Sequence, residues 1–202
     1  DSMWPMRLHD EVVHAAATEA LPQLVAGLSE PIQPVTQDQI RGIFSGNPHQ
    51  RRKPWIFKEG EEGLYSFSTE AYEGPESPNG STPIYYGINY VFDQNGRLVQ
   101  FEYIEGERPY DRGHPNYQEF RRYDEEGYLT ERSTWQRIMQ PFITDRFEYT
   151  LGNDGRKVPI KMTRTMKVQG DSYEHKDSDP MTVDLANYKE WLAKNPNGFA
   201  VV

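Results

Sequence analysis

The chain has 202 residues, a formal net charge of −9 at pH 7 and no cysteine. The missing cysteine excludes disulfides, thiolate metal sites and cysteine nucleophiles. The acidic balance argues against nucleic acid as a partner, since nucleic-acid binders usually carry a basic excess, and it favours solubility and a basic protein partner. Aromatic residues make up 13% of the chain, a composition that suits pleated sheets.

The ends of the chain leave two compartments open. The first residue is Asp1, and Met3 follows it closely. If Met3 is the native start, we expect a cytoplasmic protein. If the chain is a trimmed precursor, we expect a periplasmic or envelope protein. No run of about 18 apolar residues is present, so we expect no transmembrane segment.

The N-terminal part predicts helices. Residues 6–28 place apolar side chains at helical spacing, and Pro22 interrupts the run, which leaves one kinked helix or two short ones. Thr36 and Gln39 have the spacing of a capping box, which predicts a short helix that ends at Ile43.

From Trp55 onward the apolar period changes to two, which predicts strands at Trp55–Lys58 and Leu64–Tyr72. A Pro/Gly-rich loop is expected at residues 73–83. A first hairpin follows around Asn95-Gly96, a pair of residues that favours two-residue turns. With that turn, three pairs of apolar residues share one face: Phe92 with Val99, Tyr90 with Phe101, and Ile88 with Tyr103.

The hairpin around Asp154-Gly155 has the clearest pattern. A two-residue turn predicts four apolar pairs: Leu151 with Val158, Tyr149 with Ile160, Phe147 with Met162, and Ile143 with Met166. The same register places two opposite-charge pairs across the strands, Asp145 with Arg164 and Glu148 with Lys161.

A weaker hairpin joins Phe120–Tyr123 to Leu129–Ile138. Its simplest register pairs Arg122 with Glu131, but it also places Arg121 opposite Arg132, so a longer or bulged turn is an alternative. The polar residues 171–180 are expected to form a loop, and Asp184–Lys194 predicts a C-terminal helix.

Two segments share a core of Asp, Gly and Leu at fixed spacing. Residues 90–100 read YVFDQNGRLVQ and residues 121–131 read RRYDEEGYLTE. Both segments resemble YD-repeat hairpins. The matching residues are Asp93, Gly96, Arg97 and Leu98, and then Tyr123, Asp124, Gly127 and Leu129. The resemblance covers about 30 residues and implies a bacterial meander sheet. A third segment, residues 151–158, keeps the glycine but has Gly152 in place of the aspartate.

These elements predict a single domain over residues 1–202 with an α+β fold. It consists of a helical N-terminal arm at residues 1–50, an antiparallel sheet at 55–170 and a C-terminal helix at 184–195. The sheet is expected to be a meander of about six to eight strands, curved or partly closed.

A partner-binding face is expected around the second hairpin. Tyr128, Trp135 and Arg137 are of the types enriched at interface hot spots, and core packing is the alternative. Asp124, Glu125 and Glu126 form an acidic turn where a basic partner could dock, and charged turns also serve to keep sheet edges soluble.

Two further groups of residues could in principle form a metal site or a catalytic site, but each has a simpler structural interpretation. Asp171, Glu174, His175, Asp177 and Asp179 could ligate Ca²⁺ but fit a solvated loop better. His114 with Asp111 could act as a general base, although a plain connection between strands is the simpler interpretation. We therefore predict no catalytic residue, no cofactor and no metal site.

The favoured hypothesis is a non-enzymatic protein-binding module, specifically a bacterial immunity or antagonist protein that neutralises a basic toxin. Two alternatives remain. One is a structural component of an envelope or phage-like assembly, and the other is an enzyme or small-ligand binder with a barrel-like pocket.

Overall fold

The computed structural model describes residues 21–45, 54–73, 84–107, 115–136, 142–169, 175–177 and 179–196. The chain divides into two compact units. The first comprises Asp1–Asp10, Pro34–Phe120 and Trp135–Gln140, and the second comprises Glu11–Gln33, Arg121–Thr134 and Pro141–Val202. The single domain expected over residues 1–202 stays a prediction. Within the described ranges, no helix is both long enough and apolar enough to cross a membrane.

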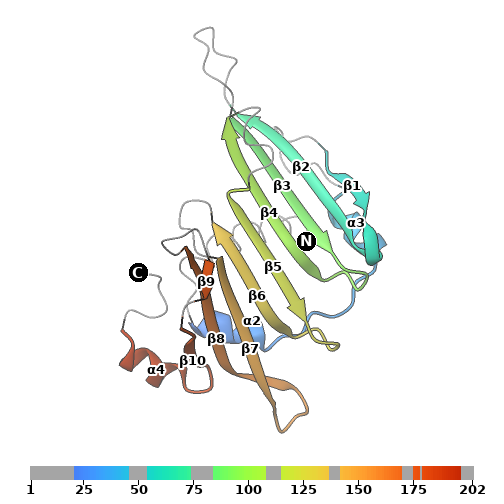
Figure 1. Cartoon of the computed structure of the whole chain (residues 1–202). Coiled ribbons are helices and arrows are strands. Elements are labelled where there is room, and N and C mark those ends of the chain that lie inside the picture. Colours follow the sequence, from blue (N-terminus) through green and yellow to red (C-terminus); the bar gives the residue numbers. More distant parts are fainter. Residues whose placement is uncertain are drawn as a thin grey trace. The chain divides into compact units, whose positions relative to one another are not determined.

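The first unit is an antiparallel meander in which each strand pairs with the next one along the chain, from β1 to the first residues of β5 (Figure 1). Its elements are α3 (Gln37–Ile43), β1 (Ile56–Glu59), the short 3₁₀ helix η1 (Glu61–Gly63), β2 (Tyr65–Glu73), β3 (Ile84–Phe92), β4 (Leu98–Glu107) and the start of β5 (Tyr117–Tyr123).

The second unit continues the same pattern from the end of β5 through β6, β7 and β8. Both β9 and β10 then pair with β8, again antiparallel. Its elements are α2 (Leu21–Leu28), β6 (Leu129–Gln136, to Thr134 in this unit), β7 (Phe142–Leu151), β8 (Lys157–Gln169), β9 (His175–Asp177), β10 (Met181–Asp184) and α4 (Tyr188–Lys194).

The α+β class and the antiparallel meander are confirmed, and two details are corrected. The described residues contain ten strands, more than the expected six to eight. In neither unit does the strand order return to its first strand, so the expected partial closure is wrong. The additional strands β9 and β10 lie in a segment predicted as a loop and a helix start. Each has only three or four residues, too few for an apolar period to be detected.

The helix predictions hold where the structure describes them. The Oγ1 of Thr36 accepts the N–H of Gln39 at 3.2 Å, and the Gln39 side chain accepts the N–H of Thr36 at 2.9 Å, which confirms the capping box. Pro22 lies in the first turn of α2, where its missing N–H costs no hydrogen bond. The C-terminal helix begins at Tyr188 rather than Asp184, because Asp184 ends β10 and its carboxylate accepts the N–H of Asn187.

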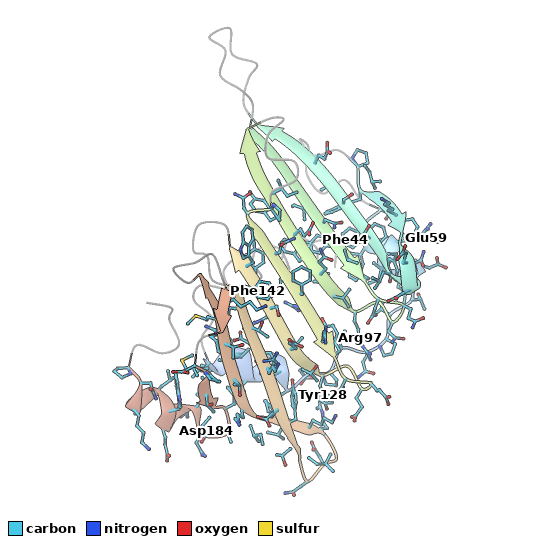
Figure 2. The ribbon with its side chains drawn as sticks, viewed as in Figure 1. Phe44, Glu59, Arg97, Tyr128, Phe142 and Asp184 are labelled. Atoms are coloured by element: carbon cyan, nitrogen blue, oxygen red, sulfur yellow. The ribbon has the colours of Figure 1, made fainter. Side chains whose placement is uncertain are left out.

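The first unit has an aromatic core. Phe44, which ends α3, stacks on Phe67 of β2 with ring centroids 4.4 Å apart, and it meets the edge of Trp55 at 4.7 Å (Figure 2). Tyr90 and Phe101 face each other across β3 and β4 as predicted, with centroids 5.0 Å apart. Both are almost fully buried, so these rings supply the main hydrophobic stabilisation of the unit.

The second unit has an aliphatic core. Three leucines of α2 pack against buried side chains of the strands. Their spacing of three and four residues aligns them on one helix face. The members of this core are Leu21, Leu24, Leu28, Phe147, Met162, Val183 and Leu185.

In the first and last hairpins, the predicted registers are right along most of the strands and wrong next to the turns. Phe92 pairs with Leu98 rather than Val99. In the last hairpin Tyr149 pairs with Pro159 rather than Ile160, and Leu151 pairs with Lys157 rather than Val158. The other predicted pairs of these two hairpins are present: Ile88 with Tyr103, Phe147 with Met162, Ile143 with Met166, Asp145 with Arg164, and Glu148 with Lys161.

The turn type explains the shift beside the turns. A bulge then returns the strands to the predicted register, between Val91 and Phe92 in the first hairpin and between Glu148 and Tyr149 in the last. Two backbone hydrogen bonds close each of the three hairpins. The first residue of the turn donates its N–H to the carbonyl of the fifth residue, and its own carbonyl accepts the N–H of the glycine at the fourth position. These turns begin at Asp93, Asp124 and Gly152. Each turn glycine has a positive φ, between 72° and 97°. This is a type I turn followed by a bulge at glycine, with one residue more than the two-residue turn that we predicted.

The extended segment between α2 and α3, residues 29–36, is named here the connector. In the first unit, Val35 donates its N–H to the carbonyl of Asn95 at 2.8 Å. In the second unit, Ile32 donates its N–H to the carbonyl of Gly127 at 2.9 Å, and Glu30 forms an ion pair with Arg156 at 3.0 Å. The connector thus contacts all three turns.

Gly96 and Gly155 occupy the same turn position and offer a matched comparison. A Cβ on Gly96 would lie 2.3 Å from the carbonyl oxygen of Val35, whereas a Cβ on Gly155 would have no atom of the described residues within 4 Å. We expect Gly155→Ala to cost about 1–2 kcal/mol from its positive φ alone. Gly96→Ala should cost about 2–5 kcal/mol because the clash adds to the same strain.

Urea unfolding of the two variants measures the difference. Equal losses of stability would show that the connector does not rest tightly on Gly96.

Candidate functional site

The predicted acidic turn is held in one conformation by its own first residue. The Asp124 carboxylate accepts the backbone N–H groups of Glu126 and Tyr128, each at 3.0 Å. Asp93 does the same in the first turn, accepting from Asn95 and Arg97. These bonds give the aspartate of both turns a structural role, since they fix the backbone of the turn.

Lys157 of β8 lies against this turn. Its Nζ is 2.7 Å from Asp124 Oδ2 and 3.3 Å from Glu126 Oε1, and it lies 5.6 Å from the ring centroid of Tyr128. Burial alone would raise the pKa of the Asp124 carboxyl. The hydrogen bonds from Lys157 and from the two N–H groups outweigh burial and lower that pKa below its ordinary value. The hydrogen bond with Asp124 also raises the pKa of Lys157.

Tyr128 is buried, with 3% of its surface exposed, so its interpretation as an exposed hot-spot residue is wrong (Figure 2). Its ring centroid lies 5.4 Å from that of Tyr149, and its hydroxyl accepts the N–H of Lys157 at 3.2 Å. Tyr149 in turn donates its hydroxyl to the carbonyl of Leu129. Burial, with the nearby Asp124, raises the pKa of Tyr149, so its phenol stays protonated. The core-packing alternative therefore holds for Tyr128.

The structure brings together only part of the predicted partner-binding set. Asp124, Glu126 and Tyr128 meet at Lys157, and Glu125 is exposed beside them. Trp135 is half-buried and belongs to the first unit, whereas Asp124, Glu125, Glu126 and Tyr128 belong to the second. The remaining residue of the set, Arg137, lies outside the described residues.

A second polar cluster lies inside the second unit. Asp145 is 1% exposed and accepts two hydrogen bonds from Arg164, at 2.7 and 2.9 Å. Arg132, also buried, reaches the same carboxylate at 3.2 Å. The hairpin register predicted the pair of Asp145 with Arg164. For Arg132 only the neighbour across β5 and β6 was considered, so its bond to Asp145 was not predicted. The pairing of Arg132 with Asp145 across β6 and β7 depends on a contact between two different hairpins.

The other candidate residues lie mostly outside the described part of the chain. This applies to Asp111, His114, Asp171 and Glu174. His175 and Asp177 belong to β9, and Asp179 is exposed. Among the described residues, no group of three or more His, Cys, Asp or Glu side chains is placed to hold a metal ion.

Comparisons with known proteins returned no matching family model, no similar curated protein and no similar solved structure.

The bonds of Asp124 generate a pH-dependent prediction. Asp124→Ala removes both turn hydrogen bonds and should cost roughly 1 kcal/mol or more. Asp124→Asn keeps an acceptor for the turn but loses the ion pair with Lys157. Because the folded-state pKa of Asp124 is lowered, its contribution is complete above the ordinary value of 3.8 and is lost as the pH falls through the folded-state pKa.

Chemical unfolding of wild type and Asp124→Asn between neutral and acidic pH checks this sign. The difference between them should be largest near neutral pH and should vanish in acid. A difference that grows in acid would contradict the ion pair.

Truncating Asp145 should be far more damaging. Asp145→Ala leaves the guanidinium groups of Arg132 and Arg164 buried without their shared carboxylate, which should cost about 3–5 kcal/mol. The matched control is Glu148→Ala, three residues along β7. Its ion pair with Lys161 is 3.3 Å long but exposed, and its loss should cost less than about 1 kcal/mol. Thermal or urea unfolding compares the two, and equal losses would refute a stabilising buried cluster.

Proposed function

We propose that this chain is a non-enzymatic protein-binding module that neutralises a basic partner, as a bacterial immunity or antagonist protein neutralises a toxin. The observation that carries the proposal is the acidic turn of the second unit. Glu125 and Glu126 are exposed on it, and the side chain of Glu126 is 61% accessible. The bonds of Asp124 hold the turn rigid, so its charges are presented with little loss of conformational entropy on binding.

The residues of the acidic turn do not all have the partner-contacting role that the sequence predicted for them. Glu125 and Glu126 supply the accessible charge, while Asp124 and Tyr128 position the turn. Lys157 compensates part of the negative charge locally. The net charge of −9 adds long-range attraction toward a basic surface. The similarity of the first two turns to YD-repeat hairpins supports a bacterial origin.

Charge reversal on the turn tests this proposal. The wild-type chain is used as bait in lysate of the source organism at moderate salt, and the dominant stoichiometric partner is purified. We expect a basic protein whose association rate falls steeply with ionic strength. Glu125→Lys should weaken its binding by about tenfold or more, because a charge of the wrong sign then faces the partner.

The control is Glu190→Lys, which changes the net charge equally but lies on α4. Its binding should stay close to that of wild type. Equal weakening by both variants would mean that only net charge matters and would remove the turn as the site. Absence of any stoichiometric basic partner would contradict the proposed function itself.

A further inference from the structure

The three hairpin turns share one backbone geometry, yet they differ in what covers them. In the first turn the chain buries the three corresponding positions: Phe92 is 0% exposed, Arg97 is 5% exposed, and Gly96 is buried. The backbone of Val35 from the connector passes directly over Gly96. In the second turn the corresponding Tyr128 and Gly127 are buried too, and Ile32 of the connector bonds to Gly127.

In the third turn, between β7 and β8, the three corresponding residues Leu151, Gly155 and Arg156 are exposed. Leu151, which corresponds to Phe92, is 71% exposed and has the most accessible large hydrophobic side chain among the described residues. Gly155 is exposed, and no atom from the part of the chain that the structure describes lies within 4 Å of the place where its Cβ would be. The Arg156 side chain is 53% exposed and pairs with Glu30, at the beginning of the connector. The space that Val35 fills over the first turn is therefore open over the third.

We propose that the face of the third turn formed by Leu151, Gly155 and Arg156 is a docking site for an extended apolar segment of a partner protein. The first turn shows what such an occupant is: an extended stretch with a β-branched apolar residue next to proline, as in Pro34-Val35. In the proposed complex the segment covers Gly155, as the backbone of Val35 covers Gly96, and packs against Leu151.

The charge of the site adds a requirement. Arg156 and Glu30 form a solvent-exposed ion pair, and such pairs are weak. A carboxylate on the incoming segment can therefore replace Glu30 at Arg156 at little cost. The occupant that fits is thus an extended segment with an isoleucine or valine, a proline and a nearby acidic residue. This site differs from the acidic turn and does not depend on the proposed function.

A peptide with the sequence of the connector tests the site directly. The probe is residues 29–36, Ser-Glu-Pro-Ile-Gln-Pro-Val-Thr, added to the full-length, isotope-labelled chain while amide NMR shifts are recorded. We expect saturable shifts at Leu151, Gly155 and Arg156. The titration extends to about 5 mM, because a Kd near 1 mM corresponds to only about −4 kcal/mol.

Two variants of the same hairpin serve as test and control. Leu151→Asp places a charge on the proposed face and should weaken binding about tenfold or more. Val158 is also exposed, but it pairs with Thr150 and so lies on the opposite face from Leu151. Val158→Asp should therefore bind the peptide like wild type. Leu151 is 71% exposed and Val158 is 43% exposed, so a carboxylate at either position can reach solvent and neither change should unfold the chain.

The remaining outcomes overturn the inference. Shifts confined to Gly96 and Gly127 would mean that the peptide only displaces the chain's own connector. No saturable shift, or equal weakening in Leu151→Asp and Val158→Asp, would also reject the site. Self-association abolished by Leu151→Asp, without peptide binding, would identify a second copy as the occupant instead. A basic partner that binds the acidic turn without peptide binding at the third turn would retain the proposed function and reject this inference alone.

Discussion

The feature on which most of this structure depends is the five-residue turn that closes each of the three hairpins. Its two backbone hydrogen bonds and its positive-φ glycine fix the residue pairs next to the turn. In the first and third hairpins a bulge, at Val91/Phe92 and at Glu148/Tyr149, then sets the pairs further along the strands. Because neighbouring residues of a strand point to opposite faces, that register decides which side chains enter the core. The turn and the bulge together place the aromatic core of the first unit and the buried Asp145 cluster of the second, and the second turn itself presents the exposed Glu125 and Glu126.

The sequence predicted the fold class and most strand pairs because the relevant signals are local. Alternation of apolar residues marks a strand, and an aspartate followed three residues later by glycine marks a turn. The predicted registers failed only beside the turns, where Asn95-Gly96 and Asp154-Gly155 suggested a two-residue loop. Such dipeptides suit either turn type, and the choice depends on a glycine bulge that a pattern of hydrophobicity does not encode. The short strands β9 and β10 were missed because pairing with β8, rather than composition, makes them strands.

The candidate site was predicted less well, because exposure is a tertiary property. Tyr128 follows the turn glycine and resembles a surface residue, but Lys157 and Tyr149 enclose it, and both come from a different hairpin. The bond of Arg132 to Asp145 was likewise missed because the two residues lie on different hairpins, across β6 and β7. The acidic residues Glu125 and Glu126 were recognisable because they occupy the two central positions of a turn, which point to solvent in almost any packing. Sequence reasoning thus finds turn charges readily, and it misjudges polar residues that another hairpin covers.

The position of the connector also has a consequence for the order of folding during synthesis. Glu30 and Arg156 are 126 residues apart in sequence, although both belong to the second unit. A chain is made from its N-terminus, so the connector leaves the ribosome long before the last hairpin that it contacts. The ion pair of Glu30 with Arg156 can form only when β7 and β8 have been made and have paired. Such long-range closure raises the entropic barrier of folding, and the apolar face of α2 can pack against Phe147, Met162 and Val183 only after their strands have been synthesised. The connector can therefore meet the first two turns before the last hairpin is complete, and its contact with Arg156 forms last.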